Sequence, residues 1–316
     1  MKPRIAQHGR LMASLEAALA ERYDVLPLWQ HADRDAAIRA HGGGVRALVT
    51  SAAVGADAAL LHAFPALEMV ASFGVGHDQL DGDAVRARGL KASYTPDVLN
   101  DCVADTAFAL LLDVARGVSA ADRFVRRGDW LKGTFPLATR LSGKRLGILG
   151  LGRIGRAIAR RAEGFGMQIR YTNRRPVDGA GWRHEPSLAA LAEWADFLVV
   201  AAAGGAETRH IVDAEILDAL GPRGFLVNIA RGSVVDEAAL VAALTDRRIA
   251  GAGLDVFEDE PRVPEALFAL DNVVLLPHVA SATHETRQAM ADLVLDNLRA
   301  HFDGAPLPSP IPGVSA

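Results

Sequence analysis

Short apolar segments of strand type alternate with helical patterns along most of the chain, and this alternation constrains the fold more than any other feature. Four strand-like segments lie before residue 97, and six more lie between residues 144 and 278. Runs this continuously apolar suit strands buried on both faces, and strands that alternate with helices form parallel sheets. We therefore expect an α/β protein with two doubly wound parallel-sheet domains, which the length of 316 residues also favours.

Between the two series lies an apolar segment, residues 103–118, which predicts a long helix. The charged segment that follows, residues 122–144, contains Pro136 and several glycines, and we expect it to be irregular. It would form the connection between domains or an arm that packs on a partner. The pattern at residues 285–302 predicts a last helix, and the tail PLPSPIPG cannot continue it because proline disrupts helical hydrogen bonding.

Composition and charge limit the classes of function. The net charge of −4 provides no broad positive field for nucleic acid or for an anionic membrane. No run approaches the ~18 apolar residues of a membrane span. Cys102 is the single cysteine, so an internal disulfide is excluded and a reducing compartment fits. We expect a cytoplasmic protein that binds neither nucleic acid nor membranes and has no metal site.

The motif GLGRIG follows a strand-like segment and opens a helical pattern. Gly150 allows the tight turn, Gly152 lets the backbone approach a pyrophosphate, and Gly155 lets the helix pack on the strand. Arg153, in the first helical turn, opposes the helix dipole unless an anion such as phosphate binds there. We assign these residues and Ile154 to a dinucleotide site; the alternative is an ordinary glycine-rich turn.

The next strand-like segment ends at Asn173, where NAD-binding chains usually place an acid that accepts hydrogen bonds from the adenosine ribose. Here the amide is followed by Arg174 and Arg175, whose planar guanidinium groups suit a 2′-phosphate. The sequence therefore predicts NADP(H) rather than NAD(H) as the cofactor. The alternative is that one of the two arginines is simply solvated.

Three polar residues follow later strand-like segments, at the sheet edge where doubly wound folds bind ligands. Arg231 can neutralise a carboxylate or polarise a carbonyl, His278 can exchange a proton, and Glu260 can stabilise the charged imidazole. This set suits reduction of a 2-keto acid, with the hydride from a nicotinamide and the proton from His278. Glu258 and Asp259 are alternatives to Glu260, and Arg231 could instead anchor the acidic start of the next helix.

The chain resembles the D-isomer-specific 2-hydroxyacid dehydrogenase family almost from end to end, through these motifs and through FGVGHDQLD, TPDVLNDCVADTAFALLL, NIARGSVVDEAALVAAL and NVVLLPHVASATHETR. Within the family it looks most like the NADPH-dependent glyoxylate/hydroxypyruvate and hydroxyphenylpyruvate reductases. The resemblance implies a flavodoxin-like substrate-binding domain, residues 1–99 plus 284–316, and a Rossmann-type NADP-binding domain, residues 100–283. It also implies an active site in the cleft between them and a homodimer.

The resemblance assigns roles to individual residues. The three strand-end residues become the catalytic triad, in which Arg231 holds the substrate carboxylate and carbonyl. The backbone amides of Val75 and Gly76 are expected to bind the substrate carboxylate. Asp255 is expected to form a hydrogen bond with the nicotinamide carboxamide near Ala230.

We therefore expect NADPH-dependent reduction of small 2-keto acids to 2-hydroxy acids, with glyoxylate and hydroxypyruvate yielding glycolate and D-glycerate. Small side chains in TSAAVGAD, residues 50–57, leave room for a bulkier substrate such as hydroxyphenylpyruvate. A dinucleotide-sensing interaction protein is a second alternative, although the chain has no long extension of disordered composition. An NAD-dependent biosynthetic dehydrogenase of the phosphoglycerate type conflicts with the pair of arginines after Asn173.

Overall fold

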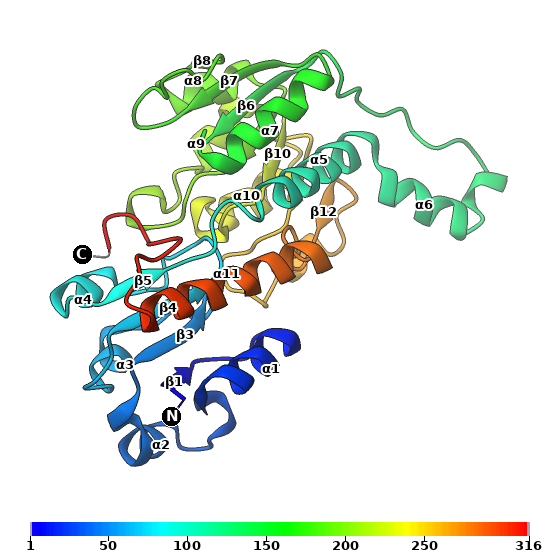
Figure 1. The fold of residues 1–316 in the computed structure, drawn as a ribbon. Coiled ribbons are helices and arrows are strands. Elements are labelled where there is room, and N and C mark those ends of the chain that lie inside the picture. The colour runs from blue at the N-terminus through cyan, green and yellow to red at the C-terminus, as the bar shows by residue number, and fades with distance from the viewer. Residues whose placement is uncertain (1, 315–316) are drawn as a thin grey trace. The chain divides into compact units, whose positions relative to one another are not determined.

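The computed structural model describes residues 2–314, and these residues form two compact units (Figure 1). The first unit contains the described residues up to Leu99 and those from Ala282 onward, and the second unit is Asn100–Ser281. Each unit contains one parallel sheet with helices on both faces, so the predicted α/β fold is confirmed.

The sheet of the first unit has five strands in the order β2-β1-β3-β4-β5, all of them parallel to their neighbours. This is the flavodoxin-like order. The strands are β1 (Arg4–Gln7), β2 (Asp24–Pro27), β3 (Ala47–Ser51), β4 (Met69–Phe73) and β5 (Lys91–Ser93). Strand β2 was not among the predicted segments, because its short sequence DVLP begins with an exposed aspartate and ends with proline. Proline is tolerated there because β2 lies at the edge of the sheet.

Two helical layers cover this sheet. The helices are α1 (Ala13–Arg22), α2 (Arg34–His41), α3 (Ala58–His62), α4 (Gly82–Ala87) and α11 (His284–Phe302). Helix α11, whose sequence pattern was recognised, packs against β4 and α1. Leu60, Leu61 and Phe64, in and after α3, are buried in the core on the other face. Beyond α11 the tail runs along β5, where the Ile311 amide donates to the Ala92 carbonyl oxygen at 2.9 Å.

The sheet of the second unit has seven parallel strands in the order β12-β11-β10-β9-β6-β7-β8. The strands are β6 (Arg145–Leu149), β7 (Gln168–Thr172), β8 (Arg183–His184), β9 (Phe197–Val200), β10 (Phe225–Asn228), β11 (Gly251–Leu254) and β12 (Val273–Leu275). From β6 the chain proceeds outward to β8 and then returns to β9 on the other side of β6. This reversal is the topological switch point at which Rossmann-type sheets bind dinucleotides.

Two groups of helices flank the seven-stranded sheet. Helices α5 (Asn100–Arg116) and α7 (Arg153–Gly164) pack side by side (Figure 1). Helices α8 (Leu188–Trp194), α9 (Ala214–Leu220) and α10 (Glu237–Thr245) enclose a second core with the sheet. The aspartates before α9 and α10, Asp213 and Asp236, cap these helices by accepting hydrogen bonds from the Ile216 and Ala239 amides.

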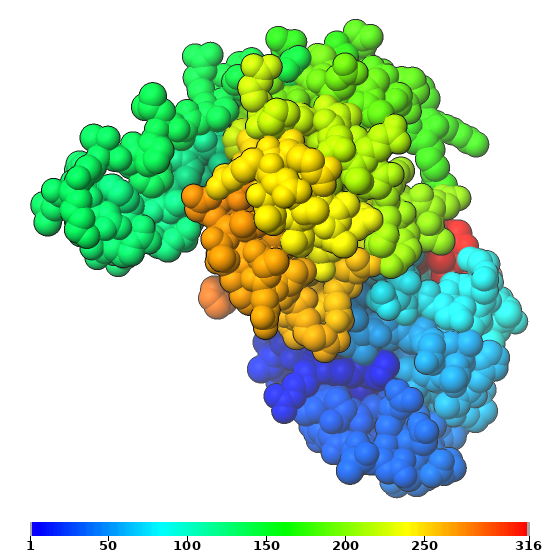
Figure 2. Space-filling view, turned by 180° about the vertical axis from the view of Figure 1, so that it is seen from behind, coloured from blue at the N-terminus to red at the C-terminus, as the bar shows by residue number. Residues whose placement is uncertain are grey.

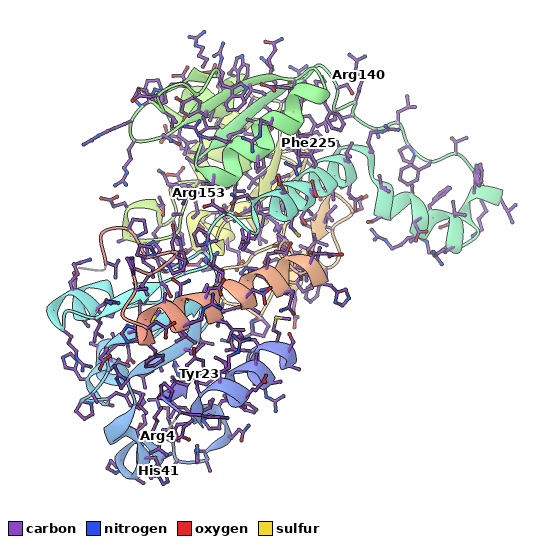
Figure 3. All side chains as sticks on the ribbon, viewed as in Figure 1. Arg4, Tyr23, His41, Arg140, Arg153 and Phe225 are labelled. Carbon is purple, nitrogen blue, oxygen red and sulfur yellow. The ribbon has the colours of Figure 1, made fainter. Side chains whose placement is uncertain are left out.

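An arm of residues 117–140 extends from the second unit (Figures 1 and 2). Its first part is a helix, α6 (Val118–Arg126), where the sequence analysis expected part of an irregular segment. Gly117, with φ of 63°, ends α5 and begins α6, so the predicted long helix stops at residue 116. Arg140, labelled in Figure 3, lies where the arm returns to the second unit. Within residues 2–314, no helix has the length and hydropathy needed to cross a membrane.

Candidate active site

The glycine-rich loop joins β6 to α7 at the switch point. Gly150 has φ of 97°, and a Cβ there would lie 2.6 Å from the Ala202 amide nitrogen beyond β9. At Gly155 a Cβ would lie 2.1 Å from the Gly150 carbonyl oxygen, so the fold itself requires both glycines. Gly152 differs, because apart from its immediate chain neighbours no heavy atom of the described residues lies within 4 Å of its Cβ position. The loop therefore presents an open backbone cradle at the start of α7, which fits a pyrophosphate.

The residues predicted to bind the cofactor's adenosine end lie beside this loop. The Asn173 side-chain oxygen accepts a hydrogen bond from the Leu151 amide at 2.7 Å, so Asn173 helps to fix the loop. Arg174 forms an ion pair with Glu207, and both side chains are exposed. Arg175 is also exposed. Arg153 and Ile154 begin α7, with Arg153 exposed (Figure 3) and Ile154 partly buried.

Glu260 and His278, two of the three residues predicted to be catalytic, are in direct contact. Glu260 Oε2 lies 2.7 Å from His278 Nδ1, and Oε1 accepts a hydrogen bond from the Phe257 amide at 3.1 Å. Burial alone would raise the pKa of Glu260, but the hydrogen bond with His278 and nearby positive charge outweigh it, and the pKa is lowered. The ionised carboxylate can only accept, so Nδ1 carries the hydrogen and Nε2 remains for proton exchange.

A buried aspartate fixes the backbone that carries His278. Asp255 is 1% exposed, and its two carboxylate oxygens accept hydrogen bonds from the Val279 and Ala280 amides at 2.8 and 3.0 Å. Its carbonyl oxygen accepts from the His278 amide at 2.8 Å. Burial raises the pKa of Asp255, and the two amide hydrogen bonds oppose this shift. These contacts hold His278 at φ of 53°, a left-handed conformation that histidine rarely adopts.

The loop after β10 carries Arg231 and is fixed by a second buried polar residue, Asn228. The Asn228 side chain is 1% exposed, donates to the Arg231 carbonyl oxygen at 2.9 Å and accepts from the Ala230 amide at 3.0 Å. The Arg231 guanidinium donates to the Ala230 carbonyl oxygen at 2.8 Å, and its charge contributes to the lowered pKa of Glu260. Asn228 was not predicted to be a site residue, although an amide at the end of an apolar strand is a visible signal.

The structure distinguishes between the three acids that follow β11. Glu258 pairs with Arg209 and His210, while Asp259 pairs with Arg262. Of the three, it is Glu260 that contacts His278. The alternatives considered for the acid are therefore engaged elsewhere, and Arg231, Glu260 and His278 gather at one edge of the second unit's sheet.

Val75 and Gly76 belong to the first unit and follow β4 after one residue, Gly74. The preceding turn is fixed by Thr95, whose hydroxyl accepts from the Gly74 amide at 3.0 Å and whose amide donates to the Gly74 carbonyl oxygen at 2.9 Å. Val75 and Gly76 are themselves partly exposed. Their predicted role in binding the substrate carboxylate stays a prediction, as does the predicted contact of Asp255 with a nicotinamide.

A Rossmann-type sheet with an open glycine-rich cradle, and with an arginine, a glutamate and a histidine along its carboxyl edge, defines an oxidoreductase that uses a nicotinamide dinucleotide. Residues 108–280 match the family model for the D-isomer specific 2-hydroxyacid dehydrogenase, NAD binding domain. The chain belongs to this family, as its motifs predicted.

Individual relatives are similar over nearly their full length. The chain is 48% identical over 297 residues to glyoxylate/hydroxypyruvate reductase A of Arabidopsis thaliana, covering 94% of this chain and 95% of the relative. It is 50% identical over 299 residues to hydroxyphenylpyruvate reductase of Plectranthus scutellarioides, with the same coverage. A solved structure of the NADPH-dependent glyoxylate/hydroxypyruvate reductase from Sinorhizobium meliloti, in complex with NADP and malonate, has a TM-score of 0.93 and 46% identity and covers 99% of this chain and 97% of that chain.

Proposed function

We propose that this protein reduces small 2-keto acids with NADPH, with glyoxylate and hydroxypyruvate as substrates and glycolate and D-glycerate as products. The observation that carries the proposal is the contact of 2.7 Å between Glu260 and His278, on the same sheet edge as the open Gly152 cradle. Relatives named glyoxylate/hydroxypyruvate reductase support the choice of substrate.

The proposed mechanism assigns one task to each polar residue. When bound, the reduced nicotinamide supplies the hydride. Arg231 holds the carboxylate of the keto acid and polarises its carbonyl group. Glu260, ionised because its pKa is lowered, keeps the hydrogen on Nδ1 of His278 and stabilises the imidazolium. His278 then donates its Nε2 proton to the oxygen that becomes the hydroxyl group, and Asp255 keeps the histidine in place.

The proposed cofactor is NADP(H), held in the second unit. The Gly152 cradle and Arg153 would bind the pyrophosphate, and Arg174 and Arg175 would bind the 2′-phosphate. Arg174 would exchange its exposed partner, Glu207, for the phosphate. The complex of the Sinorhizobium meliloti reductase with NADP supports this assignment.

The first unit would then be the substrate-binding domain, with the amides of Val75 and Gly76 on the substrate carboxylate. We also propose a homodimer joined through the second unit. The arm supports this, because Trp130, Leu131 and Leu137 on it are 69%, 94% and 104% exposed. Large apolar side chains exposed on an arm of this kind are typical of a protein interface. A single cysteine supports a reducing compartment such as the cytoplasm.

A bulkier substrate such as hydroxyphenylpyruvate is the second candidate. The relative from Plectranthus scutellarioides, named for that reaction, is 50% identical to this chain. The loop after β3, which runs Ala52-Ala53-Val54-Gly55, also carries no aromatic or long side chain.

A matrix of kcat/KM values tests these assignments, with NADPH and NADH each paired with glyoxylate, hydroxypyruvate and hydroxyphenylpyruvate. We expect the highest value for NADPH with glyoxylate or hydroxypyruvate. A higher value with NADH would overturn the cofactor assignment, and a higher value with hydroxyphenylpyruvate would favour the second candidate. Absence of turnover with every 2-keto acid would overturn the proposed function.

A further inference from the structure

An ion-pair cluster that the proposed mechanism does not use joins Glu258, in the loop after β11, to Arg209 and His210, in the segment between β9 and α9. Glu258 Oε1 accepts a hydrogen bond from Arg209 Nη2 at 2.6 Å and lies 2.9 Å from His210 Nε2. The Glu258 amide donates to the Glu237 carboxylate at 3.1 Å. The side chains of Glu258 and His210 are 27% and 34% exposed, so this contact is partly shielded from solvent. Shielding strengthens such a pair relative to an exposed one.

The backbone of residues 209–212 is hydrogen-bonded to the loop after β10. The His210 amide donates to the Ser233 carbonyl oxygen at 2.8 Å, and the Val212 amide donates to the Val234 carbonyl oxygen at 3.1 Å. His210 has φ of 51°, a left-handed conformation that persists in a non-glycine residue only where several contacts enforce it. Residues 209–212 therefore bridge the loop after β10 and the loop after β11.

We propose that Arg209, His210 and Glu258 form a latch, which holds the Arg231 loop and the Glu260 loop in the alignment needed for reduction. The three are positioning residues, and their role rests on the proposed catalytic roles of Arg231 and Glu260. His210 is bonded to Ser233, two residues after Arg231, and Glu258 lies two residues before Glu260. The latch thus acts beside both residues.

The loop after β10 and the loop after β11 pack directly on each other, so a small displacement of one displaces the other. At Gly232 a Cβ would lie 1.9 Å from the Phe257 carbonyl carbon, so the backbones of the two loops are in contact beside Arg231. If the latch is removed, the loops can slide along this contact. A displacement of about 1 Å in a catalytic group reduces turnover by up to roughly a hundredfold.

Kinetics of latch variants test the proposal, with a matched control in the same loop. Asp259 provides the control, because it forms a bidentate pair with Arg262, at 2.7 and 2.8 Å, within the loop. We expect His210→Ala and Glu258→Ala each to lower kcat about tenfold and to raise the KM of the keto acid, because the misplacement is partial. Asp259→Ala should stay within about twofold of wild type, as exposed pairs contribute little.

Two further variants make the result specific to the latch. The double variant His210→Ala/Glu258→Ala should be no slower than the slower single variant, because each single change already removes the contact between His210 and Glu258. His210→Gln should restore most of the activity, since the glutamine amide nitrogen takes the place of Nε2 and can donate to Glu258.

Each contrary result has a distinct meaning. If the losses of kcat in the two single variants multiply in the double variant, the latch is overturned. It is also overturned if the latch variants have a lower Tm but wild-type kcat and KM. If Arg231→Gln and His278→Gln abolish activity while the latch variants behave like Asp259→Ala, the latch alone fails. If Arg231→Gln or His278→Gln retains wild-type activity, the proposed function itself fails.

Discussion

The replacement Glu260→Gln tests whether a charged partner beside His278 is needed for reduction. It keeps the size of the side chain and an oxygen that can accept from the Phe257 amide, but it removes the negative charge that faces Nδ1. A hydrogen bond to a charged group contributes roughly 1.5–3 kcal/mol. Because the two side chains are 40% and 33% exposed, solvent screening reduces this to about 1–2 kcal/mol, a loss of roughly 5- to 30-fold in kcat/KM at neutral pH.

The pH dependence gives the same test a second readout. The pKa of Glu260 is depressed, so the stability contributed by its ionised carboxylate is present above the ordinary value of about 4.3 and is lost as pH falls through the depressed value. Wild-type activity should therefore have an acid limb below that ordinary value, and Glu260→Gln should lack it.

Initial rates, followed by the absorbance of the reduced cofactor, measure both effects, with circular dichroism at each pH as a control for folding. A variant within about twofold of wild type at neutral pH, well below the loss expected from a screened charged hydrogen bond, would refute the reasoning. An acid limb that persists in Glu260→Gln would show that another group causes it.

Three further predictions concern the cofactor cradle and the arm. Gly152→Ala should stay within about 1 kcal/mol of the wild-type free energy of unfolding but weaken NADPH binding, whereas Gly150→Ala should lower the free energy of unfolding by about 2 kcal/mol or more because of its positive φ. Calorimetry measures the stability and fluorescence titration the binding. Equal losses of stability in the two variants would contradict this difference. Arg174→Ala should raise the KM of NADPH about tenfold, the value of a charged hydrogen bond, and leave NADH nearly unaffected; a parallel change for both cofactors would argue against a 2′-phosphate site. Leu131→Glu should convert the proposed dimer into monomers in light scattering, because it places a charge on a side chain that is 94% exposed in the single chain. If a dimer forms and survives this change, the interface lies elsewhere.

The central strands were predictable because buried strands leave a continuous apolar signal. The strands β2 and β8 were missed because one is an edge strand that ends in proline and the other contains two residues. The helix α6 was missed because its charged residues and neighbouring glycines resemble a loop. A left-handed glycine, Gly117, separates it from α5.

The candidate site was partly predictable for a related reason. Polar residues at strand ends stand out in an apolar sequence, so Arg231 and His278 could be identified. The residue pattern alone left three nearby acids open and the family resemblance chose Glu260, because the choice depends on which carboxylate the folded loop turns toward the histidine. The contacts of Asp255 and Asn228 were also hidden, since their partners are backbone groups that no sequence pattern encodes.

The tail that runs along β5 has a consequence for aggregation. β5 is the last strand of its sheet, and an uncovered last strand presents unpaired amides and carbonyls to other chains. The hydrogen bonds of Ser309 and Ile311 to Tyr94 and Ala92 occupy these groups, and the neighbouring prolines prevent the tail from recruiting a further strand. Removing the tail after α11 would therefore expose an edge strand that favours aggregation. Shortened versions of this chain should retain the tail.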